Sequence, residues 1–262
     1  MVQKRELEDR VLFIAGVGPQ MGAATARIAA REGARLILVA RTPPDTLAEE
    51  IRAAGGEALA LSCDVTEKDS LRAAHAAGVA AFGPVDCVFY NAGYYDNAHD
   101  SIDVDDELWQ MTMDVNYNGA HHLARLVLPS MLERGRGTFV FNSSAASLVA
   151  GQVRFGYQVS KAGLNALTRF IAARYGRYGV RANATLPFVV GGEVGAVAGA
   201  QNCLGRSGYA EEIGEAVTFL LSDRSSIITG QIIHLDGGLF ARASWPTNAV
   251  PYQPPAPANP AG

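Results

Sequence analysis

The chain has 262 residues, of which 48% are apolar and only 18% are charged, and its formal net charge is −4. Such a chain is too apolar to be disordered and long enough to bury a large core, so it needs neither disulfides nor a metal to fold. The slight excess of acidic residues argues against electrostatic binding to nucleic acid or to an anionic membrane.

Short apolar runs alternate with patterns of helical period along the chain. Runs that are apolar on both faces predict strands buried on both faces, as in a parallel sheet. We therefore expect an α/β fold, with a single Rossmann-type doubly wound parallel seven-stranded sheet flanked by helices. The predicted strands cover 10–16, 35–41, 57–65, 84–93, 137–144, 180–187 and 231–238, and the predicted helices cover 24–34, 45–56, 67–82, 105–133 and 157–177.

The composition changes near residue 240. No linker or internal repeat interrupts the preceding sequence, which predicts one domain over 1–240. Residues 241–262 form a Pro-rich C-terminal tail with half of the twelve prolines, which exclude helix and central strand there. Two interpretations remain open: a disordered end, or a segment that docks on a surface through Trp245 and Tyr252.

Targeting and redox features are sparse. The first ten residues lack the apolar stretch of a secretory signal. The sequence also contains no run of about 18 apolar residues, the length needed to span a membrane. The three cysteines are too few and too scattered for a disulfide framework or a four-cysteine zinc site. We expect a cytoplasmic protein without a metal site.

A glycine-rich loop, AGVGPQMG over 15–22, joins the first predicted strand to the first predicted helix. Glycines there allow backbone N–H groups to approach a pyrophosphate, which the helix dipole also favours. The loop contains Gly16, Gly18 and Gly22, with Gln20 and Met21 between the last two.

The end of the second predicted strand bears on the choice of dinucleotide. An acid at this position favours NAD, whereas a nearby arginine suits the 2′-phosphate of NADP. The strand ends at Arg41, and no acid follows until Asp45. NADP(H) is therefore favoured and NAD(H) remains possible, unless Arg41 is only a solvated surface charge.

A series of motifs appears in a characteristic order. After the glycine loop come Cys63-Asp64-Val65, Tyr90-Asn91-Ala92-Gly93, Asn116, Ser143-Ser144, Tyr157-x-x-x-Lys161, Asn183 with Pro187, and Asp236-Gly237-Gly238. Over roughly residues 7–240 the sequence resembles the short-chain dehydrogenase/reductase family. The resemblance implies an oxidoreductase that uses a nicotinamide dinucleotide to interconvert a carbonyl and an alcohol.

The resemblance also implies a cofactor site, in which Asp64 bonds the adenine and Asn91 to Gly93 line the cleft. The full set expected to contact the cofactor is Gly16, Gly18, Gln20, Met21, Gly22, Arg41, Asp64, Val65, Asn91, Ala92, Gly93, Tyr157, Lys161, Pro187 and Val190.

Four residues match the catalytic set of the family: Asn116, Ser144, Tyr157 and Lys161. Tyr157 and Lys161 are four residues apart and share one helix face, so the ammonium is expected to lower the pKa of the phenol. Tyr157 would then exchange a proton with the substrate oxygen, while Ser144 polarises the carbonyl. Lys161 also suits ribose hydroxyls. Asn116 would interrupt the long helix and hold a water that relays protons.

Three features depart from the family pattern. Gln20 replaces the middle glycine of the phosphate loop, and Phe188 replaces the glycine that usually follows Pro187, which puts an aromatic ring near the expected nicotinamide. The segment 188–204, expected to cover the substrate, is short and rich in small residues.

The residues expected near the substrate are mostly apolar or aromatic, and no basic residue clearly enters the site. They are Tyr94, Tyr95, Ala146, Val153, Phe155 and Phe188. This favours a hydrophobic or aromatic ketone over a sugar or an acid. By the same resemblance, a homotetramer or homodimer would form through the helices 105–133 and 157–177.

Two other functions remain open. Gln20 and Phe188 would also suit a cofactor-free lyase similar to halohydrin dehalogenases, although Lys161 and Asp64 argue against it. A non-catalytic cofactor-binding protein is the third possibility, and the complete set Asn116, Ser144, Tyr157 and Lys161 argues against that.

Overall fold

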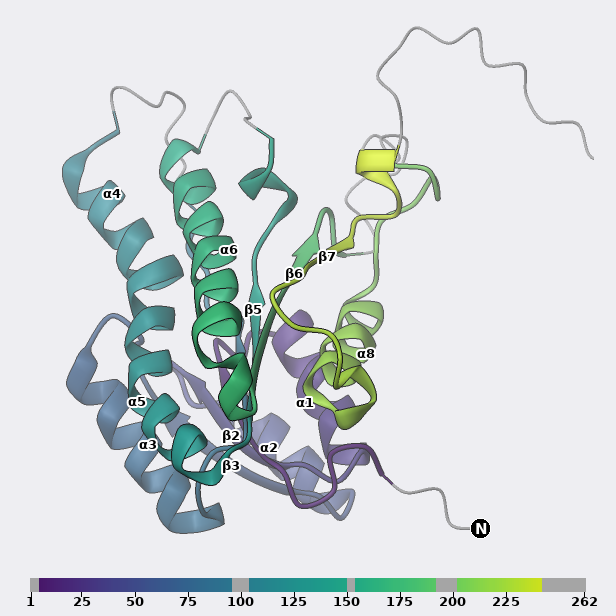
Figure 1. Ribbon diagram of the computed structural model, residues 1–262. Coiled ribbons are helices and arrows are strands. Elements are labelled where there is room, and N and C mark those ends of the chain that lie inside the picture. Colours follow the sequence, from purple (N-terminus) through teal and green to yellow (C-terminus); the bar gives the residue numbers. More distant parts are fainter. Residues whose placement is uncertain (1–4, 96–103, 150–153, 192–201, 242–262) are drawn as a thin grey trace, which may run out of the picture.

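The computed structural model describes residues 5–95, 104–149, 154–191 and 202–241. Its centre is a seven-stranded sheet in the order β3-β2-β1-β4-β5-β6-β7 (Figure 1), in which every pair of neighbours is parallel. The strands are β1 (Val11–Ala15), β2 (Arg35–Ala40), β3 (Glu57–Ser62), β4 (Cys87–Tyr90), β5 (Gly137–Asn142), β6 (Val180–Pro187) and β7 (Ile232–Leu235). The predicted doubly wound parallel sheet is confirmed.

Helices cover both faces of the sheet. On one face lie α3 (Lys68–Phe82), α5 (Gly119–Arg134) and α6 (Phe155–Tyr175), whose apolar side chains share a core with the sheet. On the other face lie α1 (Met21–Arg31), α2 (Asp45–Ala53) and α8 (Ala210–Leu221), which bury a second core (Figure 1). Burial on both faces explains why the strands are continuously apolar.

The long helix predicted over 105–133 is interrupted, as expected from the position of Asn116. It begins as α4 (Asp106–Met113), passes through a π-helical turn, η1 (Asp114–Asn118), and continues as α5. The extra residue in such a turn changes the direction in which side chains project and is frequent at functional sites.

One helix was not expected from the sequence. α8 packs on α1, with Ile213 and Val217 buried and with Glu211 and Glu212 in its first turn. Its apolar spacing and N-terminal acids are the signals of an amphipathic helix. Several strands are also shorter than predicted: β4 starts three residues later than the run 84–93, and β5 ends at Asn142.

The strand order reverses between β1 and β4, and this places the functional cleft. The chain runs from β1 outward to β3 and then returns to β4 on the other side of β1. The connections that follow β1 and β4 therefore run toward opposite edges of the sheet. At the carboxyl ends of these strands, the Asn91 amide nitrogen donates to Ala15 O (2.8 Å) and the Asn91 side chain to Gly16 O (2.7 Å). The glycine loop and the 91–93 segment therefore meet at this point.

None of the helices in the described part of the chain combines the length and the apolar character needed to cross a bilayer. The tail beyond residue 241, and with it Trp245 and Tyr252, lies outside the described residues.

Candidate active site

Tyr157 and Lys161 lie one turn apart near the start of α6, and both side chains are buried. The Lys161 ammonium is 5.6 Å from the centre of the Tyr157 ring and donates a hydrogen bond to the Asn142 carbonyl oxygen (2.8 Å). The end of β5 thus holds the lysine beside the tyrosine, as the spacing predicts.

Ser144 follows β5 by two residues and faces the same helix. Its hydroxyl accepts a hydrogen bond from the Ala146 amide (3.3 Å) and hydrogen-bonds Tyr157, an interaction that lowers the pKa of that tyrosine. The neighbouring Ser143 hydroxyl donates to the Lys161 carbonyl oxygen (3.0 Å). The two serines therefore attach the β5 loop to the first turns of α6.

Asn116 lies in the π-helical turn and is fully buried. Its Oδ1 accepts from the Tyr94 amide (2.6 Å), and its Nδ2 donates to Tyr94 O (2.9 Å) and to Ser160 Oγ (2.9 Å). The Ser160 hydroxyl donates in turn to Tyr157 O (2.8 Å). Asn116 is thus a polar link between the segment after β4 and the turn of α6 that contains Tyr157.

Gly93 lies close to the side chains of Lys161 and Asn116 and shows how near they are to each other. A Cβ atom added there would lie 3.7 Å from Lys161 Nζ and 3.9 Å from Asn116 Oδ1. The structure therefore brings together all four residues predicted as catalytic.

The ionisation of the tyrosine differs from the sequence expectation. Burial raises the pKa of Tyr157 above its usual value, and a hydrogen bond with Tyr95 adds to this. Burial also lowers the pKa of Lys161 to about 8. The expected lowering of the phenol pKa by the ammonium is therefore not found, because loss of hydration dominates at both residues.

The glycine loop fits a dinucleotide pyrophosphate. Gly16 has φ +87°, and a Cβ there would lie 2.3 Å from Ala92 N, so only glycine fits. A Cβ on Gly22 would lie 2.8 Å from Gly16 O. Gly18, in contrast, would meet nothing within 4 Å, so its backbone faces open space at the start of α1. That combination of a tight turn and an open backbone suits a phosphate group.

The other residues predicted around this loop also gather at the cleft. The side-chain nitrogen Nδ2 of Asn142 donates to Asn91 Oδ1 (2.8 Å) and to Met21 Sδ (3.6 Å). These bonds connect α1, the segment after β4 and the end of β5. Gln20 is exposed at the N-terminus of α1, and its Nε2 lies 3.3 Å from where a Cβ on Gly191 would stand. Gln20 thus projects toward the segment that follows β6.

Arg41, Asp64 and Val65 lie at the carboxyl ends of β2 and β3. Arg41 is exposed, and its carbonyl oxygen accepts a hydrogen bond from the Ser62 hydroxyl (2.9 Å). The Asp64 carboxylate caps the following turn by accepting from the Thr66 amide (2.9 Å) and hydroxyl (2.8 Å). The carboxyl ends of β2 and β3 are adjacent, as is required if residues from both ends bind the same adenosine.

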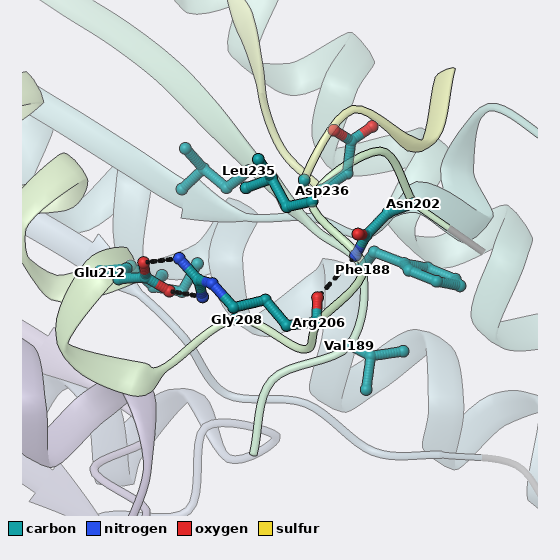
Figure 2. A pocket seen from close by; sticks show the side chains of 11 residues that line it. Phe188, Val189, Asn202, Arg206, Gly208, Glu212, Leu235 and Asp236 are labelled. Atoms are coloured by element: carbon teal, nitrogen blue, oxygen red, sulfur yellow. Dashed lines mark hydrogen bonds and ion pairs between the residues drawn. The ribbon is translucent and has the colours of Figure 1, made fainter. Parts of the chain in front are cut away.

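The segment after β6 borders a pocket of about 150 Å³. It is lined by Phe188, Val189, Asn202, Leu204, Arg206, Gly208, Glu212, Ile213, Leu235, Asp236 and Gly237. Figure 2 shows the Phe188 ring at one end of these residues and the Arg206–Glu212 pair at the other. That pair is bidentate (2.9 and 2.6 Å) and fixes the turn to α8.

The predicted residues after β6 are described only in part. Pro187 ends β6, and Val190 forms a bridge with Gly208. Most of the segment 188–204, which was expected to cover the substrate, lies outside the described residues.

Several of the predicted substrate residues contact the residues predicted as catalytic. Tyr94 is tied to Asn116, Ala146 follows Ser144, and Phe155 packs against Trp109 of α4, with ring centres 5.7 Å apart. Tyr95 stacks on the Tyr157 ring itself, at 4.6 Å and an interplanar angle of 19°. Val153 lies outside the described residues.

Sequence reasoning missed three residues at the site. Asn142 and Ser160 hold Lys161 and Asn116, and nothing in their local sequence distinguishes them. Arg154 places its guanidinium 5.3 Å from the centre of the Tyr95 ring. The expectation that no basic residue enters the site is therefore wrong. Arg154 could have been found, since it is the only basic residue between Ser144 and Tyr157.

Comparisons with known proteins agree with this geometry. The sequence profile described as Enoyl-(Acyl carrier protein) reductase, a short-chain dehydrogenase/reductase profile, matches residues 16–240. The chain is 34% identical to L-rhamnose 1-dehydrogenase (NAD(P)(+)) from Azotobacter vinelandii, covering 89% of this chain and 98% of that protein. It is 33% identical to cis-4-hydroxycyclohexanecarboxylate dehydrogenase from Sinomonas cyclohexanicum, covering 89% and 97%.

A solved structure is similar throughout. A short-chain type dehydrogenase/reductase from Mycobacterium ulcerans superimposes with a TM-score of 0.84 at 29% sequence identity, covering 90% of this chain and 92% of that one. The profile, the relatives and the fold lead to one conclusion: this chain belongs to the short-chain dehydrogenase/reductase family, the NAD(P)-dependent oxidoreductases of alcohols and carbonyl compounds.

Proposed function

We propose that the chain is an NADP(H)-preferring oxidoreductase that interconverts a secondary alcohol and a ketone on a substrate with a hydrophobic or aromatic body. In the oxidation, Tyr157 takes the hydroxyl proton of the alcohol, and a bound nicotinamide would accept the hydride, so that the ketone is left. In the reduction, Tyr157 returns the proton to the carbonyl oxygen.

The observation that carries this proposal is the pairing of the Ser144 and Tyr157 hydroxyl groups next to the Lys161 ammonium. Two hydroxyls that bond one another can both bond a single substrate oxygen placed between them. Ser144 then stabilises the negative charge that develops on this oxygen, while Tyr157 exchanges the proton. Asn116 positions the turn through Ser160, and a water held near it would pass the proton to solvent.

The chain offers groups for each part of the dinucleotide. The bound nicotinamide supplies the hydride acceptor or donor. Gly18 and the N-terminus of α1 would hold the pyrophosphate, Asn91 to Gly93 the cleft, and Lys161 the ribose hydroxyls. Arg41, without a neighbouring acid at the end of β2, supports the preference for the 2′-phosphate of NADP.

The names of two relatives are consistent with alcohol substrates, since one is an L-rhamnose 1-dehydrogenase and the other a cis-4-hydroxycyclohexanecarboxylate dehydrogenase. Exposed Phe170 of α6 and Tyr178, in the turn that follows α6, support the expectation that this part of the chain contributes to a homodimer or homotetramer. A cytoplasmic location and a single domain over 1–240 stay predictions.

The test is an assay with NADP⁺ or NAD⁺ and a panel of alcohols, and with NADPH or NADH and the matching ketones, followed through the absorbance of the reduced nicotinamide. Turnover that requires the cofactor and is faster with NADP(H) supports the proposal. Halide release from a halohydrin without cofactor would identify the lyase instead. Cofactor binding without turnover of any alcohol would indicate a binding protein.

A further inference from the structure

Arg154 lies beside the catalytic tyrosine. Its guanidinium carbon is 5.3 Å from the centre of the Tyr95 ring, and Tyr95 stacks at 4.6 Å on Tyr157. The charge of Arg154 reaches the catalytic group, because it acts to lower the pKa of Tyr157. When a guanidinium lies over a ring, its N–H groups point outward in the plane of the guanidinium, where they can still bind a ligand.

This charge has no counter-ion among the described residues. Nine other arginines form ion pairs with carboxylates there, namely Arg5, Arg10, Arg27, Arg31, Arg72, Arg134, Arg136, Arg206 and Arg224. The Arg154 guanidinium instead lies over an aromatic ring, that of Tyr95. The first turn of α6 contains no acidic residue, so the positive end of the helix dipole adds to the potential.

The backbone at Arg154 is unfavourable for an arginine. It has φ +65°, and apart from Asp9 it is the only non-glycine residue with positive φ in the described ranges. It also occupies the N-cap position of α6 without capping it through its side chain, a place where Ser, Asp or Asn would stabilise the helix. Strained residues of this kind concentrate at ligand sites.

Exposed aromatic side chains lie next to the charge of Arg154. Tyr95 is 54% exposed, and Phe155, which follows Arg154 directly, is 44% exposed and packs on Trp109. A ligand with both an apolar body and an anionic group would therefore find partners for both parts within reach of Tyr157.

We propose that Arg154 binds a carboxylate carried by the substrate, so that the enzyme acts on hydroxy acids and oxo acids whose acid group is attached to a hydrophobic ring or chain. This rests on the proposed function and narrows its substrate class. A bidentate guanidinium–carboxylate pair fixes both the position and the orientation of the carbinol relative to Tyr157 and Ser144.

The test compares 4-hydroxycyclohexanecarboxylate with its methyl ester, two probes that differ only in the charge at the proposed contact. The values of kcat and KM for oxidation of each are measured with NADP⁺ in the full-length wild type, Arg154→Gln, Arg154→Lys and the control Arg177→Gln. Arg177 also lies over a tyrosine ring, that of Tyr178, but lies beyond the far end of α6. Thermal melting confirms that each variant is folded.

The readout is the ratio of kcat/KM for the acid to that for the ester. Any change in the pKa of Tyr157 affects both probes equally and cancels in this ratio. We expect wild type to prefer the acid, and Arg154→Gln to lower the ratio by about 10- to 100-fold, mainly through the KM of the acid. Arg154→Lys should recover part of the ratio, and Arg177→Gln should leave it unchanged.

Two results overturn the inference: a wild type that oxidises acid and ester equally well, or an Arg154→Gln variant that loses activity on both to the same extent. Neither result touches the proposed function, because the ester would still be oxidised. Absence of turnover with every alcohol would instead reject the proposed function, and with it this inference.

Discussion

The ring of Tyr95 stacks on the ring of Tyr157, with the ring centres 4.6 Å apart and the planes inclined by 19°. The two hydroxyl groups also form a hydrogen bond that raises the pKa of Tyr157, whereas the hydrogen bond with Ser144 lowers it. The phenol of Tyr157 therefore has two neighbours with opposing effects on its pKa, and a substrate oxygen that accepts its proton would replace the Tyr95 hydroxyl.

The pH dependence of alcohol oxidation follows from this arrangement. If Tyr157 is the base of the oxidation, as proposed, kcat/KM rises as the free enzyme loses the phenol proton. Tyr95→Phe removes a bond that raises the pKa of Tyr157, and the rise in kcat/KM should move to lower pH. Ser144→Ala removes a bond that lowers it, and the rise should move to higher pH with reduced kcat. Shifts in the same direction in both variants would contradict the proposed roles.

Tyr157→Phe should abolish turnover while cofactor binding survives. The ring keeps its buried packing against Tyr95, but the proton donor is lost. General acid–base catalysis contributes about 100- to 10,000-fold, so kcat should fall within that range while the dissociation constant for NADPH changes little. Single-turnover kinetics and a binding titration measure the two quantities separately. A loss below tenfold would reject Tyr157 as the acid.

The sheet and the placement of Tyr157 beside Lys161 were predictable because they depend on local pattern and spacing. Strands that are apolar on both faces required a parallel sheet, and the interval of four residues placed Tyr157 and Lys161 on one face of α6. The cofactor-free pKa of Tyr157 was not predictable, because it depends on how deeply the ring is buried and on Tyr95, which comes from the segment after β4.

Arg154 shows a second limit of the sequence. Before the fold was known, it was one arginine in a loop rich in small residues. Its importance arises from a left-handed backbone at the start of α6 and from the Tyr95 ring, which approaches from another part of the chain. The sequence shows that Arg154 is the only basic residue between Ser144 and Tyr157, but it does not show the contact with Tyr95, which joins two distant segments.

The choice of cofactor tests the end of β2. If Arg41 contacts the 2′-phosphate, the charge-assisted bond is worth about 1.5–3 kcal/mol, which corresponds to about 10- to 150-fold in kcat/KM for NADP⁺ over NAD⁺. Arg41→Asp should erase or invert this preference, since the carboxylate repels the phosphate and can bond the ribose hydroxyls. A wild type that uses NAD⁺ equally well would reject the assignment. Arg52→Asn, at an exposed position of α2, serves as the control for a change in surface charge.

Two glycines of the loop should respond differently to alanine. Gly16→Ala forces a Cβ against Ala92 at a positive φ, and we expect it to destabilise the fold by about 2–5 kcal/mol. Gly18→Ala meets no protein atom within 4 Å, so the stability should change by less than about 0.5 kcal/mol. The affinity of Gly18→Ala for NADPH should nonetheless fall about tenfold or more. Normal cofactor binding by Gly18→Ala would place the pyrophosphate elsewhere.

The buried ammonium of Lys161 should make the stability of the cofactor-free protein depend on pH. Burial lowers the pKa of Lys161 from 10.5 to about 8, whereas the unfolded chain keeps the ordinary value. Between these two values the unfolded state binds more protons than the folded state, so the free energy of unfolding rises with pH across this window. Below about pH 8 the penalty of the buried charge is complete and constant.

Lys161→Met isolates this effect. Methionine removes the titrating group and keeps much of the apolar volume, although the Asn142 carbonyl oxygen loses its donor. All other ionisable groups are common to both proteins and cancel when the variant is subtracted from wild type. The difference in stability should shift in favour of wild type by about 3 kcal/mol between about pH 8 and pH 10.5, since one unit of pKa corresponds to about 1.4 kcal/mol. Thermal or urea unfolding of both proteins across this range, without cofactor, measures it. A difference that does not change with pH would mean that Lys161 keeps an ordinary pKa in the folded protein, and would remove burial as the factor that sets its charge.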